Sequence, residues 1–196
     1  MDLDQLRDAI ASGDPARAMP ALAGLREVSA EQAEPLLLLG LQQSTFMVRS
    51  LSCAGLGVKP TAAGWQALVQ ALEHDDDANV RAEAANALVS HSLERAWPLL
   101  LAAFQRDSQW LLRCSVLSAV AEHPAMAAAD LLQLAQLALE DADGTVRVGG
   151  AEILGRVVAQ AAQDPERAAE ARALLVQLQH DPDHRVVAAA LNGLQG

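Results

Sequence analysis

Apolar residues recur along this chain in units of about 32 to 34 positions, and each unit contains two helical patterns. The clearest markers are arginines that directly follow a valine or a leucine and lie 32, 32 and 34 positions apart: Arg49, Arg81, Arg113 and Arg147. A leucine precedes each of these arginines by 13 positions, and an aliphatic residue follows each by seven. Such self-similarity is typical of stacked repeats, in which every unit buries its apolar face against its neighbours.

Each unit is expected to form two helices, here called helix A and helix B. Residues 65–73 show the helix A pattern, with Leu68, Val69 and Leu72 on one side. An Asp-rich stretch at 75–79 then favours a turn and the N-cap of the next helix. Helix B is predicted to begin at the valine–arginine pair. Pro98 is expected in the first turn of a helix A, where proline is well tolerated.

Five units keep this pattern over residues 33–196, which we expect to form one continuous solenoid. In the last unit Val187 takes the arginine position. Residues 1–32 are predicted to form a degenerate N-terminal repeat or cap, because Arg17 lies 32 positions before Arg49 while Asp4 occupies the leucine position. The predicted fold is therefore all-α, a right-handed α-solenoid of antiparallel helix pairs.

Composition and charge support this fold and narrow the possible functions. The chain has 41 Ala and 32 Leu among its 196 residues, and only 3% aromatic residues, which favours helices over a sheet. A net charge of −11 repels nucleic acid and anionic lipid. The acidic N-terminal sequence and the absence of a long uncharged apolar stretch predict a cytoplasmic protein without membrane contact.

The residues that suggest chemistry fall at regular positions of the repeat. His91 and His123 both lie ten positions after an arginine, where Lys59 stands in an earlier unit, so we expect them to interact with carbonyl groups at helix ends. Cys53 and Cys114 are isolated and are predicted to be free thiols. We therefore expect no catalytic site, no metal site and no cofactor.

The repeat markers resemble the HEAT-repeat family, specifically the short HEAT-like repeats of phycobilisome lyases and related cyanobacterial proteins. The resemblance covers residues 33–196 and rests on the arginine positions and on an aspartate six positions before that column in four units: Asp75, Asp107, Asp141 and Asp181. Gln43 takes the aspartate position in the unit of Arg49, and Val187 takes the arginine position in the unit of Asp181. We expect each arginine to bond a turn aspartate, for instance Arg81 with Asp75 and Arg113 with Asp107.

Two functions follow from this interpretation. The first is a non-catalytic scaffold or adaptor that binds another protein, since repeat stacking creates an extended surface. The second, implied by the resemblance, is a phycobilin lyase subunit or a factor for phycobiliprotein assembly or degradation. The partner would then be a phycobiliprotein or a second HEAT-repeat subunit, and whether a bilin binds stays open.

The binding surface is expected on the side of helix B that points away from the buried positions. The candidates lie two, five or nine positions after an arginine: Leu51, Val58, Glu83, Asn86, Glu122, Glu152 and Arg156. This row changes from apolar to acidic along the chain. Such a surface would suit a partner helix with one apolar end and basic residues along its length.

Overall fold

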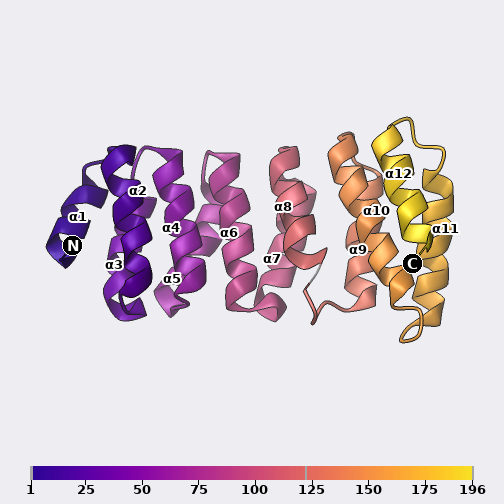
Figure 1. Cartoon of the computed structure of the whole chain (residues 1–196), viewed down its shortest axis with the longest axis horizontal. Coiled ribbons are helices and arrows are strands. Elements are labelled where there is room, and N and C mark those ends of the chain that lie inside the picture. The colour runs from indigo at the N-terminus through magenta and orange to yellow at the C-terminus, as the bar shows by residue number, and fades with distance from the viewer. Residues whose placement is uncertain (1, 122, 196) are drawn as a thin grey trace. The chain divides into compact units, whose positions relative to one another are not determined.

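The computed structural model describes residues 2–121 and 123–195, and over these residues it contains only helices (Figure 1). Twelve α-helices and one short 3-10 helix follow one another: α1 (Leu3–Ala11), α2 (Pro15–Gly24), η1 (Leu25–Glu27), α3 (Ala30–Leu41), α4 (Phe46–Val58), α5 (Ala62–His74), α6 (Ala78–His91), α7 (Leu93–Arg106), α8 (Trp110–Ala121), α9 (Ala128–Leu139), α10 (Gly144–Ala159), α11 (Pro165–Leu178) and α12 (His184–Gln195). The prediction of an all-α solenoid of helix pairs is confirmed.

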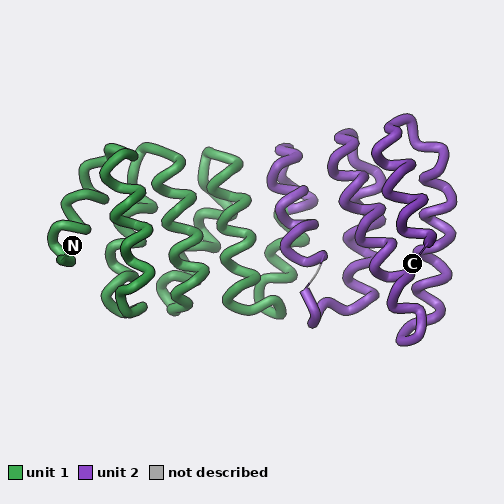
Figure 2. Tube along the Cα trace, in the orientation of Figure 1, with its two compact units in different colours: residues 1–103 green, residues 104–196 purple. Residues whose placement is uncertain are grey.

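The chain divides into two compact units, Met1–Ala103 and Phe104–Gly196 (Figure 2). In the first unit the even-numbered helices α2, α4 and α6 pack on one another, while α1, α3 and α5 form a second layer. In the second unit α8, α10 and α12 form one layer, and α9 packs on α11. Odd-numbered helices from α3 onward are the predicted A helices, and even-numbered helices from α4 onward are the predicted B helices.

Aspartate caps set where the even-numbered helices begin. The side chain of Asp77 accepts the N–H of Asn79, and the side chain of Asp143 accepts the N–H of Thr145. These caps start α6 and α10 three residues before Arg81 and Arg147, so the helices begin earlier than the valine–arginine pair predicted.

Two prolines lie at different places in their helices, and one of them corrects an expectation. Pro15 is the first residue of α2, directly after its N-cap Asp14. Pro98 lies inside α7, because that helix already begins at Leu93. The expected placement of Pro98 in a first turn is therefore wrong.

The markers of the repeat form the core. The residues directly before the arginine positions are fully buried, as are most of the leucines 13 positions upstream: Val48, Val80, Leu112, Val146, Val186, Leu68, Leu100 and Leu134 all have 0% exposure. Full burial of one such side chain stabilises a fold by about 1.5 to 3 kcal/mol. The periodic apolar pattern thus identifies the side chains that pack between neighbouring helices.

Small residues let the even-numbered helices approach closely. A Cβ atom added to Gly57 of α4 would lie 3.0 Å from the Cα of Ala87 in α6, and one added to Gly155 of α10 would lie 2.9 Å from the Cα of Gly193 in α12. Contacts this short are tighter than nearly all those of real Cβ atoms, so a side chain at either glycine would force the crossing helices to shift. No helix of the described residues combines the length and apolar character needed to cross a membrane.

Candidate functional site

The arginine positions connect each repeat to the one that follows it. Arg113 donates to the carboxylate of Asp141, with Nε 2.5 Å from Oδ2 and Nη2 3.0 Å from Oδ1. Arg49 and Arg147 make the same two-pronged contact, to Asp75 and Asp181 respectively. The carboxylate partner of Arg113 is thus Asp141 of the next repeat, which corrects the expected pairing with Asp107.

Each guanidinium also holds the turn of its own repeat. Nη1 of Arg81 lies 2.8 Å from the carbonyl oxygen of Asp75, and Nη1 of Arg113 lies 2.7 Å from that of Asp107. The expected contact within one repeat therefore exists, but it uses the backbone carbonyl. Because these side chains are occupied on both sides, the arginine row is a structural element that fixes the turns.

A second row of basic side chains closes the ends of the even-numbered helices. Nε2 of His91 lies 2.8 Å from the carbonyl oxygen of Leu56, near the end of α4. Arg156 donates to the carbonyls of Val120, Ala121 and His123 at the end of α8. The expectation that basic residues here interact with helix-end carbonyls holds for His91, although the helix belongs to the preceding repeat. For Arg156, which the sequence suggested as a binding residue, the contacts show a guanidinium already engaged within the protein.

The other predicted binding residues lie at partly or fully exposed positions of the even-numbered helices. Leu51, Glu83 and Asn86 are half-buried, while Glu152 is exposed. Val58 is 65% exposed at the end of α4. Glu122 lies outside the described residues. Within each unit, we call the solvent-facing side of the even-numbered helices the even-helix face of that unit.

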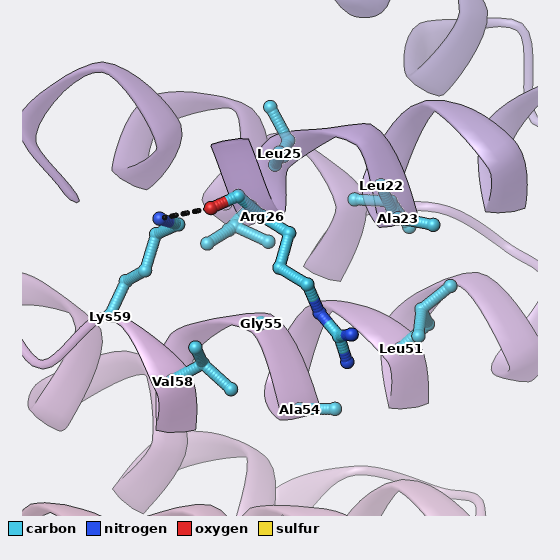
Figure 3. Close-up of a pocket in the computed structure, with 10 residues that line it drawn as sticks. Leu22, Ala23, Leu25, Arg26, Leu51, Ala54, Gly55, Val58 and Lys59 are labelled. Carbon is cyan, nitrogen blue, oxygen red and sulfur yellow. Dashed lines mark hydrogen bonds between the residues drawn. The ribbon is translucent and has the colours of Figure 1, made fainter. Parts of the chain in front are cut away.

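The first unit contains an apolar pocket on this face, between α2, η1 and α4 (Figure 3). It has a volume of about 300 Å³ and is lined by Leu22, Ala23, Leu25, Arg26, Leu37, Leu51, Ala54, Gly55, Val58 and Lys59. Two predicted binding residues, Leu51 and Val58, belong to its α4 wall, together with Ala54 and Gly55. Such a mostly apolar hollow with few polar groups is typical of a site that receives an apolar side chain or ligand.

Sequence reasoning missed the α2 and η1 wall of this pocket. Leu22 and Arg26 lie five and nine positions after Arg17, which are the same steps that selected the binding residues in later units. Extending that rule to Arg17 would have found them. The prediction treats residues 1–32 only as a degenerate cap and so does not include these two residues.

The second unit has a more polar groove on its even-helix face, between α8 and α10. Its volume is about 490 Å³, and its walls include Cys114, Leu117, Ser118, Thr145, Val148, Gly149 and Glu152. Gly149 leaves room for Leu117 in this groove, because a Cβ added to Gly149 would lie 2.9 Å from Leu117 Cδ1. Within the described residues, no group of three or more His, Cys, Asp or Glu side chains is placed to hold a metal ion.

Comparisons with known proteins agree with this fold. The family model of HEAT repeats matches residues 34–121, which supports the HEAT-repeat interpretation of that segment. No curated protein matches the chain.

Two crystal structures resemble the whole chain. An engineered protein of the Northeast Structural Genomics Consortium is 17% identical, with a TM-score of 0.59 over 100% of this chain and 96% of that one. Cex1p is 16% identical, with a TM-score of 0.62 over 97% of this chain, which spans only 41% of the Cex1p chain. At these identities the likeness concerns the fold alone.

Proposed function

We propose that this protein is a non-catalytic HEAT-repeat scaffold or adaptor that binds another protein through its even-helix face. The observation that carries the proposal is the apolar pocket of the first unit, whose α4 wall consists of side chains that the repeat pattern does not need for its own core. Repeat stacks commonly use such continuous helix faces to bind extended partners.

The exposure of Val58 strengthens this interpretation. Val58 is 65% exposed beside a pocket that is lined by leucines. A partner side chain that enters the pocket would therefore shield both Val58 and the pocket wall from water. Burial of an aliphatic side chain at the centre of an interface is a frequent source of binding energy.

The second unit has a polar candidate surface of its own. Glu152 is exposed beside the groove between α8 and α10, and Ser118 and Thr145 offer hydroxyl groups there. A basic or mixed-charge partner fits these groups, and the chain's net charge of −11 would speed its approach.

Affinity capture with two matched variants tests the proposed surface. Val58→Asp places a charge at the pocket, whereas Val176→Asp places one on the odd-numbered helix α11, where Val176 is 51% exposed. Both residues are exposed, so both variants are expected to keep the helical circular dichroism of the wild type. We expect Val58→Asp to lose specifically captured proteins and Val176→Asp to keep them. Loss with Val176→Asp but not with Val58→Asp would move the binding surface to the odd-numbered helices.

The resemblance to phycobilisome-lyase repeats suggests one class of partner, a phycobiliprotein or a second HEAT-repeat subunit, in a cytoplasmic setting. A titration of the protein with a free bilin, followed by absorbance, tests this more specific assignment. A shifted bilin spectrum that depends on Leu51 or Val58 would favour this assignment. An unchanged spectrum would exclude bilin binding and keep only the general scaffold function.

A further inference from the structure

The rim of the apolar pocket carries a cation that the protein itself does not neutralise. Arg26 is exposed on η1, and no carboxylate of the described residues forms an ion pair with its guanidinium. Figure 3 shows its side chain running across the pocket, with the guanidinium toward Leu51 and Ala54 of α4. An anionic group above the pocket could therefore form an ion pair with the Arg26 guanidinium.

Lys59 holds Arg26 in this place. Its Nζ donates to the carbonyl of Arg26, at 3.1 Å, and to the carbonyl of Val28. These bonds tie η1 to the end of α4 and leave the ammonium group of Lys59 engaged. Arg26 is thus the cation available to a ligand, on a segment that is fixed against the pocket wall.

An acidic side chain lies on the neighbouring helix of the same face. Glu83 occupies on α6 the repeat position that Leu51 occupies on α4, and α4 packs directly on α6. Glu83 is half-buried and has no ion pair among the described residues, and burial raises the pKa of its carboxyl group. A cation placed beside Glu83 would offset the cost of keeping this carboxylate charged.

We propose that the first unit binds an amphipathic helix of a partner protein, with a large apolar side chain in the pocket, a carboxylate on Arg26 and a lysine or arginine beside Glu83. This inference rests on the proposed scaffold function and specifies the chemistry of the partner. A volume of about 300 Å³ accommodates an apolar anchor of the leucine or phenylalanine kind. The opposite charges of Arg26 and Glu83 then define the direction in which the helix lies.

The charge arrangement favours a peptide over a small amphiphilic acid. A fatty acid could place its carboxylate on Arg26 and its tail in the pocket, but it would have nothing to offer Glu83. A helix carries acidic, apolar and basic side chains on one side at spacings of three and four residues, and so it can satisfy all three features together.

Selection from a phage-displayed library of helical peptides tests the proposal with the full chain as bait. Wild-type protein is expected to enrich peptides that combine an acidic residue, a large apolar residue and a basic residue on one face. Arg26→Glu should weaken the best synthetic peptide at least tenfold in fluorescence anisotropy. Exchange of the peptide's acidic residue for lysine should restore its affinity for this variant. Glu83→Lys should act in the same way on the basic residue.

Controls separate this inference from the scaffold function itself. Glu31→Lys changes a charge on the odd-numbered helix α3 and should leave peptide binding unchanged. Peptides that need Val58 but ignore both charge changes would overturn the inference while keeping the even-helix face as the binding surface. Peptides that bind the Val58→Asp variant as tightly as the wild type would overturn both this inference and the even-helix face as the binding surface. Binding of decanoate that depends on Arg26, without enrichment of any peptide, would show a site for small amphiphilic acids and also overturn the inference.

Discussion

Arg147 of α10 holds Asp181 of the following turn, with Nε 2.9 Å from Oδ2 and Nη2 2.9 Å from Oδ1. The same carboxylate accepts the N–H of Asp183 at 2.8 Å, and Asp183 in turn accepts the N–H of Arg185 in the first turn of α12. One ion pair therefore links two repeats and is joined by hydrogen bonds to the first turn of the next helix. The two side chains are only 14% and 8% exposed, so solvent screens the pair weakly.

Each of these arginines pairs with the aspartate of the following repeat, and this arrangement explains two departures from the repeat pattern. Val187 replaces arginine in the last unit, and Asp181 in that unit is already paired with Arg147. Gln43 replaces aspartate in the turn before α4, and its backbone carbonyl still accepts a bond from Arg49 at 3.1 Å. The last turn thus keeps the carboxylate contact of the arginine row, and the turn before α4 keeps the backbone contact.

Loss of the buried pair should destabilise the protein strongly. Arg147→Ala leaves the Asp181 carboxylate without its cation, and we expect a loss of about 3 kcal/mol in the free energy of unfolding. Arg185→Ala is the control, because Arg185 pairs with Asp183 while 63% exposed, and it should cost less than about 1 kcal/mol. Urea unfolding followed by circular dichroism measures both. Equal costs for the two variants would contradict the structural role of the arginine row.

The same pair should make stability depend on pH in the acid range. Hydrogen bonds from Arg147 hold the pKa of Asp181 below its ordinary value. The unfolded chain then binds the proton more tightly than the folded one, so the pair contributes fully above about pH 4 and is lost as pH falls further. Asp181→Asn should be less stable than wild type at neutral pH, and the gap should narrow in urea titrations below about pH 4. A gap that stays constant with pH would argue against ionic stabilisation.

The close helix crossing in the second unit should not tolerate a methyl group. Gly155→Ala and Gly193→Ala each place a Cβ within about 3.0 Å of the opposite backbone, and we expect a loss of about 1 to 3 kcal/mol. Gly24→Ala is the matched control, because its nearest neighbour would be Leu6 Cδ2 at 3.6 Å and the helix gains from alanine. Thermal unfolding should therefore separate the two sites. Stabilisation at Gly155 would show that α10 and α12 can move apart freely.

Cys53 should be protected from thiol reagents in the folded protein. Its side chain is fully buried in α4, and burial raises its pKa to about 12. In a Cys114→Ala variant, Ellman's reagent at mildly alkaline pH should leave Cys53 unmodified until urea unfolds the chain. The reciprocal Cys53→Ser variant keeps the half-buried Cys114, which should react with the folded protein. Fast reaction of Cys53 without denaturant would contradict its burial.

Arg156 should contribute to stability through its contacts at the end of α8. Arg156→Ala leaves carbonyl groups near Val120 and His123 without their charged donor, and we expect a loss of about 1 to 3 kcal/mol. Glu152→Ala changes an exposed residue of the same helix and should have little effect. Hydrogen exchange in the last turn of α8 should rise only in the Arg156 variant. Unchanged exchange would return Arg156 to the set of candidate binding residues.

The sequence by itself determined the helix pairs, their order and most of the core. Val80, Leu68 and Leu88 could be recognised because stacking every repeat in the same way requires the same apolar positions in each. The aspartates of the turns were also evident, since their local capping role depends only on residues nearby in the chain. The sequence further indicated Leu51 and Val58 as the apolar end of the even-helix face.

Only the tertiary structure decided which repeat each side chain serves. Asp107 and Asp141 occupy the same repeat position, so periodicity alone cannot tell whether Arg113 binds one carboxylate or the other; the stacking of the helices brings Asp141 within reach. The pocket beside Arg26 likewise depends on how α2 and η1 pack against α4. Contacts between repeats are set by helix packing in space, and a repeating pattern gives the same positions for every possible pairing.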